Sequence, residues 1–341
     1  MDLSDRLNKF NSGGLMHLIS VIMAARNEEE YIGKSLESLL NQTYPNIEII
    51  VINDGSTDRT EEIVKEYIKK YKNIRLINIE HEREWGCIVP RIIGIENAKE
   101  GILFVVDADA YYDKDYVEKC IKYLEEPNVA GAVGRIRVWD PKTWFSKCRD
   151  FHYRGRWNDI ENIKKEIKEG KIAPWIFKKS VYYEVGGYNP SLSYGEDRDF
   201  AIRLLKAGYE IVFVPETEWY HKWEEIPSKV IKTHFRIGVK NYEFIKKNRV
   251  EVVKKMYFSA LIPLIALCFV KPIFLFLLLA HVSPLYFKAL KFLRTADKNR
   301  KYALLFPFYI YVAELPASLG FLYAAIIRGY KKLINISLNI L

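Results

Sequence analysis

The feature that most constrains the fold is a regular alternation of strand-length apolar runs with segments of helical periodicity between residues 18 and 125. The predicted strands are 18–24, 47–53, 74–79 and 102–107, and the predicted helices are 28–41, 58–71, 88–99 and 115–125. Because the runs are mostly apolar, each strand should be covered on both faces, as in a mostly parallel sheet flanked by helices. The fold class is therefore α/β, and ligands of such a sheet bind beyond the carboxyl ends of its strands.

Polar side chains stand just beyond the ends of three of these strands: Arg26, Asn27, Glu28, Asp54, Asp107 and Asp109. The last two belong to VVDAD, residues 105–109, where a buried strand ends in two carboxylates two residues apart. Carboxylate oxygens are hard ligands that suit Mg²⁺ or Mn²⁺ bound to a diphosphate. Taken alone, the motif leaves open a solvated acidic turn.

Two long apolar segments occupy the C-terminal quarter of the chain, at residues 256–287 and 302–327. The net charge of +9 lies mainly there, since residues 256–341 carry ten Lys and Arg against two acids. Basic residues beside apolar segments indicate the anionic surface of a membrane, so nucleic acid is not an expected partner. A buried soluble core is the alternative for these segments.

Hinges within the two segments determine the expected topology. As one helix the first segment would be about 48 Å long at ~1.5 Å per residue, against a hydrocarbon core of ~30 Å. It fits better as two short helices hinged at Lys271-Pro272, and Pro316 offers a similar hinge in the second segment. If the flanking basic clusters stay inside, each segment enters and returns, and both chain ends are cytoplasmic.

The compartment expected for the remaining chain is the cytosol. The four cysteines show neither close pairing nor metal-ligand spacing, which favours reduced thiols. Residues 1–10 mix acids and bases without an apolar run, so no secretory signal is expected.

Residues 20–60, SVIMAARNEEEYIGKSLESLLNQTYPNIEIIVINDGSTDRT, resemble the opening of the family 2 glycosyltransferases of GT-A fold. Three further blocks follow in the family's order: DAD at 107–109, GGY at 186–188 and GED at 195–197. The resemblance covers about residues 16–240. It implies a nucleotide-diphosphate sugar as donor and a divalent metal, Mg²⁺ or Mn²⁺, as cofactor.

The resemblance also implies roles for single residues on the donor side. Asp54 would contact the base of the nucleotide, with Ala24, Arg26 and Glu28 lining the same pocket, although a helix-capping role for Asp54 is the alternative. Arg91 stands where the family has an Arg that faces the phosphates or the sugar, but Ile92 replaces an Asn that is frequent there. Asp107 would contact the nucleotide-sugar. Asp107, Asp109 and His221 would hold the metal.

Asp197 stands at the family's position for the catalytic base. Inverting transfer requires removal of a proton from a sugar hydroxyl, and a carboxylate in the first turn of the predicted helix 196–207 is kept ionised by the helix dipole. The alternative is that Glu196 and Asp197 are acidic residues that only favour the start of a helix and have no catalytic role. A transferase to polyprenyl phosphate needs no base, because its acceptor is already an anion. The retained pair therefore favours a hydroxyl on a lipid-linked acceptor.

The acceptor side is expected to include Glu196, Trp175 in an aromatic stretch that packs over the sheet, and His234 and Arg236 on a helix leading to the membrane. The expected regions are a flexible extension at 1–16, a GT-A catalytic domain at 17–240, a basic juxtamembrane helix at 241–255, and membrane-embedded helices at 256–341. The expected function is inverting transfer at the cytoplasmic face of the cell membrane.

Two readings from other classes are open to the same chain. A membrane-bound nucleotide-sugar-binding scaffold would explain the fold, but it has no need of the three carboxylates Asp107, Asp109 and Asp197. A dinucleotide-dependent dehydrogenase would require GxGxxG after the first strand, and the sequence lacks it.

Overall fold

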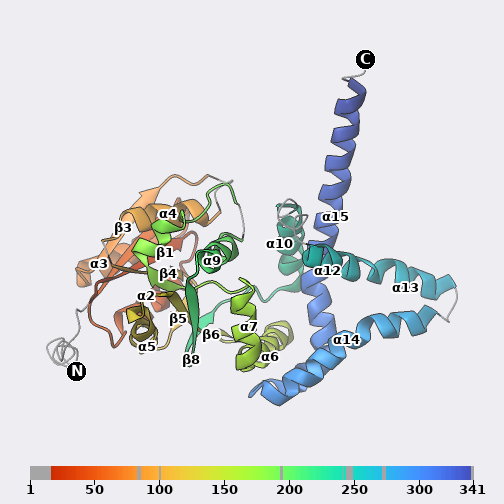
Figure 1. Cartoon of the computed structure of the whole chain (residues 1–341), viewed down its shortest axis with the longest axis horizontal. Helices are drawn as coiled ribbons and strands as arrows, with labels where there is room; N and C mark the ends of the chain where they lie inside the picture. The colour runs from red at the N-terminus through yellow and green to blue at the C-terminus, as the bar shows by residue number, and fades with distance from the viewer. Residues whose placement is uncertain are drawn as a thin grey trace. The chain divides into compact units, whose positions relative to one another are not determined.

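The computed structural model describes residues 17–82, 86–99, 101–192, 195–240, 242, 249–270 and 274–338. The chain divides into two compact units (Figure 1). The first contains residues up to Trp139 and from Trp157 to Lys222, and the second contains Asp140–Arg156 and Trp223–Leu341. The predicted extension at 1–16 lies outside the described residues.

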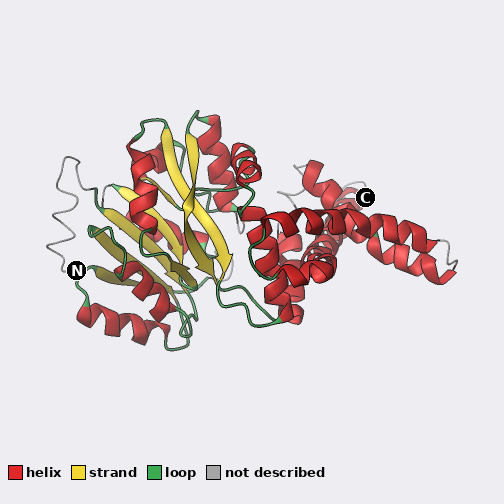
Figure 2. Cartoon of the chain, turned by 90° about the horizontal axis from the view of Figure 1, so that it is seen from below, coloured by secondary structure: helices red, strands yellow, loops and turns green. Residues whose placement is uncertain are grey.

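An eight-stranded mixed sheet forms the centre of the first unit, in the order β3-β2-β1-β4-β7-β6-β8-β5 (Figure 2). Its strands are β1 (Ile19–Ala25), β2 (Ile47–Asp54), β3 (Ile74–Ile79), β4 (Ile102–Asp107), β5 (Ala110–Tyr112), β6 (Val129–Val138), β7 (Ile176–Lys178) and β8 (Glu210–His221). The first four strands in this order pair in parallel, as the apolar runs predict. β7 runs antiparallel to both its neighbours, and β5 runs antiparallel to β8.

Short helices connect and cover these strands: α2 (Ile32–Leu40), α3 (Thr60–Lys70), α4 (Ile88–Glu96), α5 (Tyr116–Ile121), the 3₁₀ helix η1 (Lys122–Glu125), α7 (Ile160–Lys168), α8 (Lys179–Glu184) and α9 (Glu196–Lys206). The predicted helix at 28–41 begins four residues later than expected. Residues before Ile32 form turns, in which Glu28 donates its backbone N–H to the Thr60 hydroxyl (2.7 Å).

Helices make up the second unit: α6 (Trp144–Trp157), α10 (Pro227–Lys240), α12 (Arg249–Ser259), α13 (Leu261–Val270), α14 (Phe274–Thr295), the 3₁₀ helix η2 (Arg300–Leu305) and α15 (Phe306–Leu338). Of the aromatic residues of α6, Trp157 packs against Phe213 of β8 in the sheet, but Phe145 and Phe151 do not cover the sheet as the sequence suggested. Phe145 and Phe151 instead pack with Phe292, Phe306 and Tyr309 in the core of the second unit. They do so because the apolar faces of the C-terminal helices offer a larger surface to bury.

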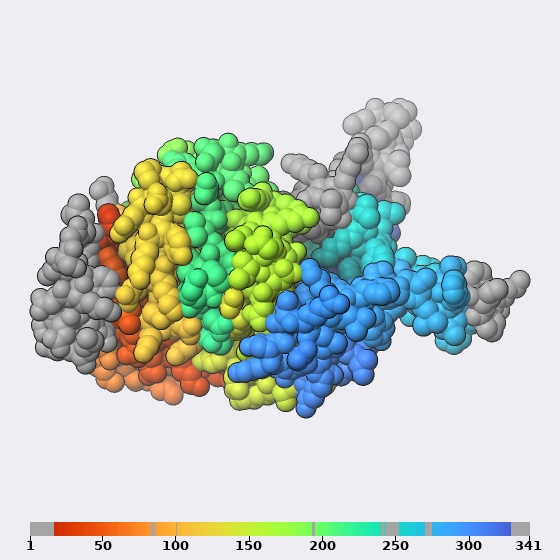
Figure 3. All heavy atoms as spheres, turned by 60° about the horizontal axis from the view of Figure 1, so that its bottom comes forward, coloured from red at the N-terminus to blue at the C-terminus, as the bar shows by residue number. Residues whose placement is uncertain are grey.

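Within the part of the chain that the structure describes, three helical segments are long and apolar enough to cross a membrane: Val252–Phe269, Leu275–Thr295 and Arg300–Arg328. α13 and α14 pack against each other and form the two legs of a hairpin (Figure 1). Their atoms project from the rest of the second unit (Figure 3). The predicted hinge at Lys271-Pro272 lies outside the described residues, between the end of α13 and the start of α14.

The second predicted hinge is wrong, because α15 continues through Pro316. Proline removes one backbone N–H from a helix but does not have to end it when neighbouring helices hold both halves. α10 and α12 pack against α15, and the imidazole Nδ1 of His234 in α10 contacts the carbonyl oxygen of Ala313 (2.5 Å). The expected second hairpin is therefore a single long helix. The predicted boundary at residue 240 also falls inside the second unit, since α10 belongs to it.

Candidate active site

Two carboxylates and an imidazole meet beyond the carboxyl end of β4. Asp107, Asp109 and His221 each offer a ligand atom, and these atoms lie within 4.8 Å of one another. His221 Nε2 is 3.3 Å from Asp107 Oδ2 and 3.4 Å from Asp109 Oδ1. The cluster combines two hard oxygen donors with a borderline nitrogen donor, which is a set that Mn²⁺ or Mg²⁺ accepts.

The sheet itself brings His221 to these carboxylates. β5 runs antiparallel to β8, so that Ala110 lies opposite His221 at the end of a twelve-residue strand. The buried hydroxyl of Ser35 in α2 lies 2.6 Å from the carbonyl oxygens of both Ala108 and Ala110. A strand pairing on one side and a helix on the other thus hold the turn that carries Asp109.

The two carboxylates differ in their electrostatic surroundings. Burial alone would raise the pKa of Asp107, but the Arg91 guanidinium and His221 outweigh burial and hold that pKa well below its usual range. The pKa of Asp109 is raised, because burial and the neighbouring Asp107 charge outweigh His221. A divalent cation would favour the ionised form of both groups.

Arg91 links this cluster to helix α9. Its Nη2 donates to Asp107 Oδ1 (2.6 Å) and its Nη1 donates to Glu196 Oε1 (2.6 Å). Its guanidinium also lies over the ring of Trp175, 5.6 Å from the centroid. Arg91 and Glu196 are both buried, so each compensates the other's charge. Glu196 therefore orients Arg91 and the start of α9.

Asp197 follows Glu196 in the first turn of α9. It is partly buried, and one carboxylate oxygen accepts the backbone N–H of Arg198 (2.7 Å). Burial and then the neighbouring Glu196 raise the pKa of Asp197. Arg203, two turns along α9, donates to the carbonyl oxygens of Val185 and Gly187 (2.5 Å each). The GGY turn is thereby tied to the helix that carries Asp197.

A second polar group gathers beyond β1, β2 and β3. His81 Nδ1 is 2.8 Å from Asp54 Oδ2, and His81 Nε2 is 2.5 Å from Arg26 Nη1. Asp54 and Arg26 are among the residues predicted from the sequence, whereas His81 is not. Its place two residues after β3 was the available signal, since β3 ends at the same edge of the sheet.

Glu28 and Ala24 lie on the same side of the sheet. Both are partly exposed. In the sheet, Ala24 pairs with Ile52 of β2 on one side and with Asp107 of β4 on the other. The pKa of Glu28 is raised to about 8, first by burial and then by the negative charge of Asp109. A cation bound near Asp109 would reverse that second effect.

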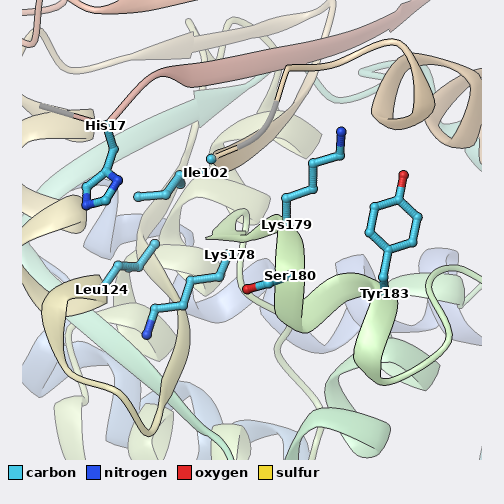
Figure 4. Close-up of a pocket in the computed structure, with 8 residues that line it drawn as sticks. His17, Ile102, Leu124, Lys178, Lys179, Ser180 and Tyr183 are labelled. Atoms are coloured by element: carbon cyan, nitrogen blue, oxygen red, sulfur yellow. The ribbon is translucent and has the colours of Figure 1, made fainter.

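A different pocket lies at the opposite edge of the sheet, where β1 and β4 begin (Figure 4). Its volume is about 510 Å³, and His17, Lys178, Lys179 and Tyr183 are among its lining residues. The ammonium groups of Lys178 and Lys179 already donate to the carbonyl oxygens of Glu126 and Ala98 (2.7 Å each). This pocket is therefore distinct from the carboxylate cluster, because it lies at the other edge of the sheet and its two lysines already donate to backbone carbonyl oxygens.

The predicted acceptor residues divide between the two units. Trp175 and Glu196 lie with Arg91 in the first unit, as described above. His234 and Arg236 belong to α10 in the second unit, where the His234 imidazole contacts the Ala313 carbonyl and Arg236 is exposed. Burial lowers the pKa of His234. Its ring has a structural contact with α15, whereas Arg236 is available to solvent or lipid headgroups.

The sheet order, the carboxylates beyond β4 and the polar group beyond β2 define a GT-A fold, the fold of nucleotide-diphospho-sugar transferases. One solved structure of this fold is a mannosyltransferase from Pyrobaculum calidifontis in complex with GDP-mannose and Mn²⁺. It superposes with a TM-score of 0.56 at 17% identity and covers 97% of this chain and 94% of that one.

Residues 20–182 match glycosyl transferase family 2, and residues 102–316, more than half of the chain, match glycosyl transferase family group 2. The chain therefore belongs to family 2 of the glycosyltransferases.

Three relatives illustrate the range of this family. Glycosyltransferase GlyA of Streptococcus pneumoniae is 40% identical over 179 residues, but the match covers 49% of this chain and only 25% of GlyA. Glycosyltransferase AglE of Haloferax volcanii is 26% identical, with 64% of this chain and 71% of AglE covered. The dolichyl N-acetyl-alpha-D-glucosaminyl phosphate 3-beta-D-2,3-diacetamido-2,3-dideoxy-beta-D-glucuronosyltransferase of Methanococcus voltae is 26% identical, with 74% of this chain and 81% of that protein covered.

Proposed function

We propose that this protein is an inverting, metal-dependent glycosyltransferase that moves a sugar from a nucleotide-diphosphate donor to a hydroxyl of a lipid-linked acceptor. The observation that carries the proposal is the connection from Asp107 through Arg91 to Glu196 at the start of α9. This connection joins the cluster of Asp107, Asp109 and His221, which could hold a metal ion, to helix α9. The second residue of α9, Asp197, is the candidate base. Such a link has no use in a scaffold that only binds nucleotide-sugar.

On the donor side, Asp107, Asp109 and His221 would hold Mg²⁺ or Mn²⁺, which supplies positive charge to a departing diphosphate. Ala24, Arg26, Glu28 and Asp54 would line the nucleotide pocket. Arg91 is already engaged with two carboxylates. We therefore assign it to positioning, so that Asp107 keeps Oδ2 directed to His221 while Oδ1 is bound by the guanidinium.

On the acceptor side, Asp197 would take the proton from the attacking hydroxyl as the new glycosidic bond forms on the opposite face from the leaving diphosphate. Trp175 offers an aromatic surface beside Arg91. The name of the Methanococcus voltae relative describes transfer to a sugar already carried on dolichyl phosphate, which is a hydroxyl acceptor. That relative supports a hydroxyl acceptor over a bare polyprenyl phosphate.

The helices of the second unit support an acceptor that is linked to a membrane lipid. Three of them are long and apolar enough to span a membrane, and Lys232 and Arg236 stand one turn apart and exposed on α10. A groove of about 470 Å³ lies between α10 and α15 beside these two cations, with Phe235, Pro316 and Leu319 among its lining residues. We propose that these cations face lipid phosphates at the cytoplasmic surface of the cell membrane.

The proposal is tested with the full chain in detergent or in vesicles, a panel of nucleotide sugars, and lipid extract as the source of acceptor. Release of nucleoside diphosphate and labelling of an extractable lipid are expected only when a divalent cation is present. Inversion is checked from the anomeric configuration of the isolated product. Labelling of polyprenyl phosphate itself, with no dependence on Asp197, would favour the alternative acceptor. Binding of donor without any transfer would favour a scaffold.

A further inference from the structure

Three side chains from three consecutive parallel strands form a hydrogen-bonded chain at one edge of the first unit's sheet. Arg26 follows β1, Asp54 ends β2, and His81 follows β3. Arg26 Nη1 contacts His81 Nε2 at 2.5 Å, and His81 Nδ1 contacts Asp54 Oδ2 at 2.8 Å. His81 is thus the middle member of the chain.

The partners of His81 determine which nitrogen carries its proton. A carboxylate only accepts hydrogen bonds, so Nδ1 must donate to Asp54. A guanidinium only donates, so Nε2 must be the unprotonated acceptor for Arg26. The neutral imidazole with its proton on Nδ1 satisfies both contacts at once. In this state the Nδ1–H of His81 donates to one oxygen of Asp54, and Nε2 of His81 accepts one N–H of Arg26.

The two oxygens of Asp54 are therefore not equivalent. Oδ2 is bound by His81, whereas Oδ1 is buried and has no hydrogen-bond partner among the described residues. Asp54 as a whole is only 5% exposed. A buried carboxylate oxygen without a donor costs free energy unless a ligand supplies one. Oδ1 is thus suited to accept one hydrogen bond from a bound molecule.

The backbone at Gly55 keeps His81 this close to Asp54. Gly55 has φ of +57°, and a Cβ built on it would lie 3.0 Å from both the backbone N and the Cβ of His81. Any other residue would be strained there and would crowd His81 away from Asp54. Gly55 therefore lets the backbone of His81 approach closely enough for its ring to reach Asp54.

We propose that the Arg26–His81–Asp54 chain selects the base of the donor, accepting uracil or thymine and disfavouring guanine. Uracil and thymine present a single ring N–H between two carbonyl oxygens, which matches one free carboxylate oxygen beside an Arg with further N–H donors. Guanine presents two adjacent N–H donors, which pair best with both oxygens of a carboxylate, and His81 occupies the second. His81 is thus a specificity-determining residue. This inference rests on the proposed function, since it assumes that the site binds a nucleotide donor.

The test measures binding of UDP and GDP to the full chain in detergent with Mn²⁺, by isothermal titration calorimetry. We expect UDP to bind at least tenfold more tightly than GDP. His81→Ala frees the second oxygen of Asp54, so the ratio should fall to about threefold or less. His81→Asn retains an N–H donor that can reach Asp54, so it should restore a large part of the preference. Because the ratio is taken within one variant, a general loss of folding does not produce the expected pattern.

A matched control is His17→Ala, since His17 lies in the pocket at the opposite edge of the sheet. It should leave the UDP to GDP ratio unchanged. Equal or tighter binding of GDP by the unsubstituted chain would overturn the inference while leaving the proposed function intact. A ratio that stays the same in His81→Ala would also overturn it. Failure of both nucleotides to bind would instead count against the proposed function itself.

Discussion

Three aspartates of the site illustrate how surroundings decide what one side chain can do. Asp107 has a depressed pKa because Arg91 and His221 outweigh its burial, whereas Asp109 and Asp197 have raised pKa values because burial outweighs the cations near them. Asp107 is therefore suited to remain a charged ligand. Asp197 is suited to take up a proton, since a raised pKa makes its carboxylate a stronger base.

Replacing Asp197 by Asn should lower turnover by roughly 10² to 10⁴, or about 3 to 5 kcal/mol of barrier, because the shape is kept and the base is lost. Donor affinity should change little, as the proposed task of Asp197 is proton removal. The measurement is kcat and donor Kd for the variant with a lipid acceptor. Near-normal turnover would refute the hydroxyl-acceptor mechanism and favour polyprenyl phosphate as acceptor.

Replacing Asp109 by Asn should weaken both donor binding and turnover, because the metal-type cluster loses a charged ligand. An excess of chelator should abolish the activity of the unsubstituted chain, and added Mn²⁺ or Mg²⁺ should restore it. Turnover is measured as release of nucleoside diphosphate from the donor, for Asp109→Asn and for the unsubstituted chain with and without chelator. Donor binding by Asp109→Asn is measured as its donor Kd. Full activity in excess chelator would mean that Asp107, Asp109 and His221 hold no ion needed for the reaction.

The raised pKa of Asp197 also predicts the acid limb of the pH profile. A base must be ionised to accept a proton, so kcat should fall as the pH drops through this pKa, at a pH above the ordinary value of about 3.9. The sign for stability is the opposite. A folded pKa above the unfolded one contributes stability at low pH that is lost as the pH rises through the folded value.

The profile is measured as kcat against pH at saturating metal and donor, so that titration of the metal-type cluster does not enter. The residual activity of Asp197→Asn serves as the control. It should lack this limb. A limb that persists unchanged in the variant would assign it to another group.

At the scale of helices, α10 and α15 cross at two glycines. A Cβ on Gly238 would lie 2.0 Å from the Ala317 carbonyl oxygen, and one on Gly320 would lie 2.1 Å from the Phe235 carbonyl oxygen. Small residues allow two helix backbones to approach closely, as in membrane helix pairs. The crossing also keeps His234 against the Ala313 carbonyl near Pro316. It explains why a proline inside α15 does not end the helix.

Gly320→Leu should therefore destabilise the second unit by about 1–3 kcal/mol or more, because neither backbone can move without breaking the crossing. The measurement is thermal unfolding of the full chain in detergent. Thr233→Leu is the matched control, since Thr233 is exposed on α10. It should shift the midpoint much less. Equal shifts for both variants would show that the close crossing contributes no special stability.

The Lys254, Lys255 and Glu314 side chains form a second link between helices of this unit. Glu314 of α15 pairs with Lys254 (2.7 Å) and with the buried Lys255 (3.1 Å) of α12. Buried ion pairs add little net stability, but removing one partner leaves an uncompensated charge. The pairing therefore fixes which faces of α12 and α15 meet.

At the scale of the whole molecule, the membrane topology follows from the helices that the structure contains. α13 and α14 form one hairpin, and its two apolar legs should enter the membrane and return. The loop between α14 and η2 should therefore lie on the same side as the first unit, in the cytoplasm, where its basic residues are favoured.

Lys298→Cys tests this topology, because Lys298 is exposed in that loop. In right-side-out vesicles, a membrane-impermeant thiol reagent should label it only after permeabilisation, as it should Glu125→Cys in the first unit. Labelling of Lys298→Cys without permeabilisation, while Glu125→Cys stays protected, would mean an odd number of crossings before residue 298.

The sequence alone determined the parallel half of the sheet, because mostly apolar runs between amphipathic helices have few other ways to be buried. It also placed Asp54, Asp107 and Asp109 at the carboxyl edge of the sheet, since a residue just beyond a parallel strand lies there. His81 was not predicted, although it stands two residues after β3, because β3 is the least buried of the parallel strands. Local sequence patterns could not assign α6 to the second unit either, because an amphipathic pattern predicts an apolar face but not the surface that this face packs against.

Only the tertiary structure decided which partners the site residues meet. Arg91 and Glu196 are 105 positions apart, and the hydrogen bond between them requires α4 and α9 to lie beside the same strand end. His221 reaches Asp107 and Asp109 only because β5 pairs with β8 in one register. The Pro316 hinge failed as a prediction for the same reason: helix continuity there depends on α10 and α12, which the sequence around Pro316 does not contain.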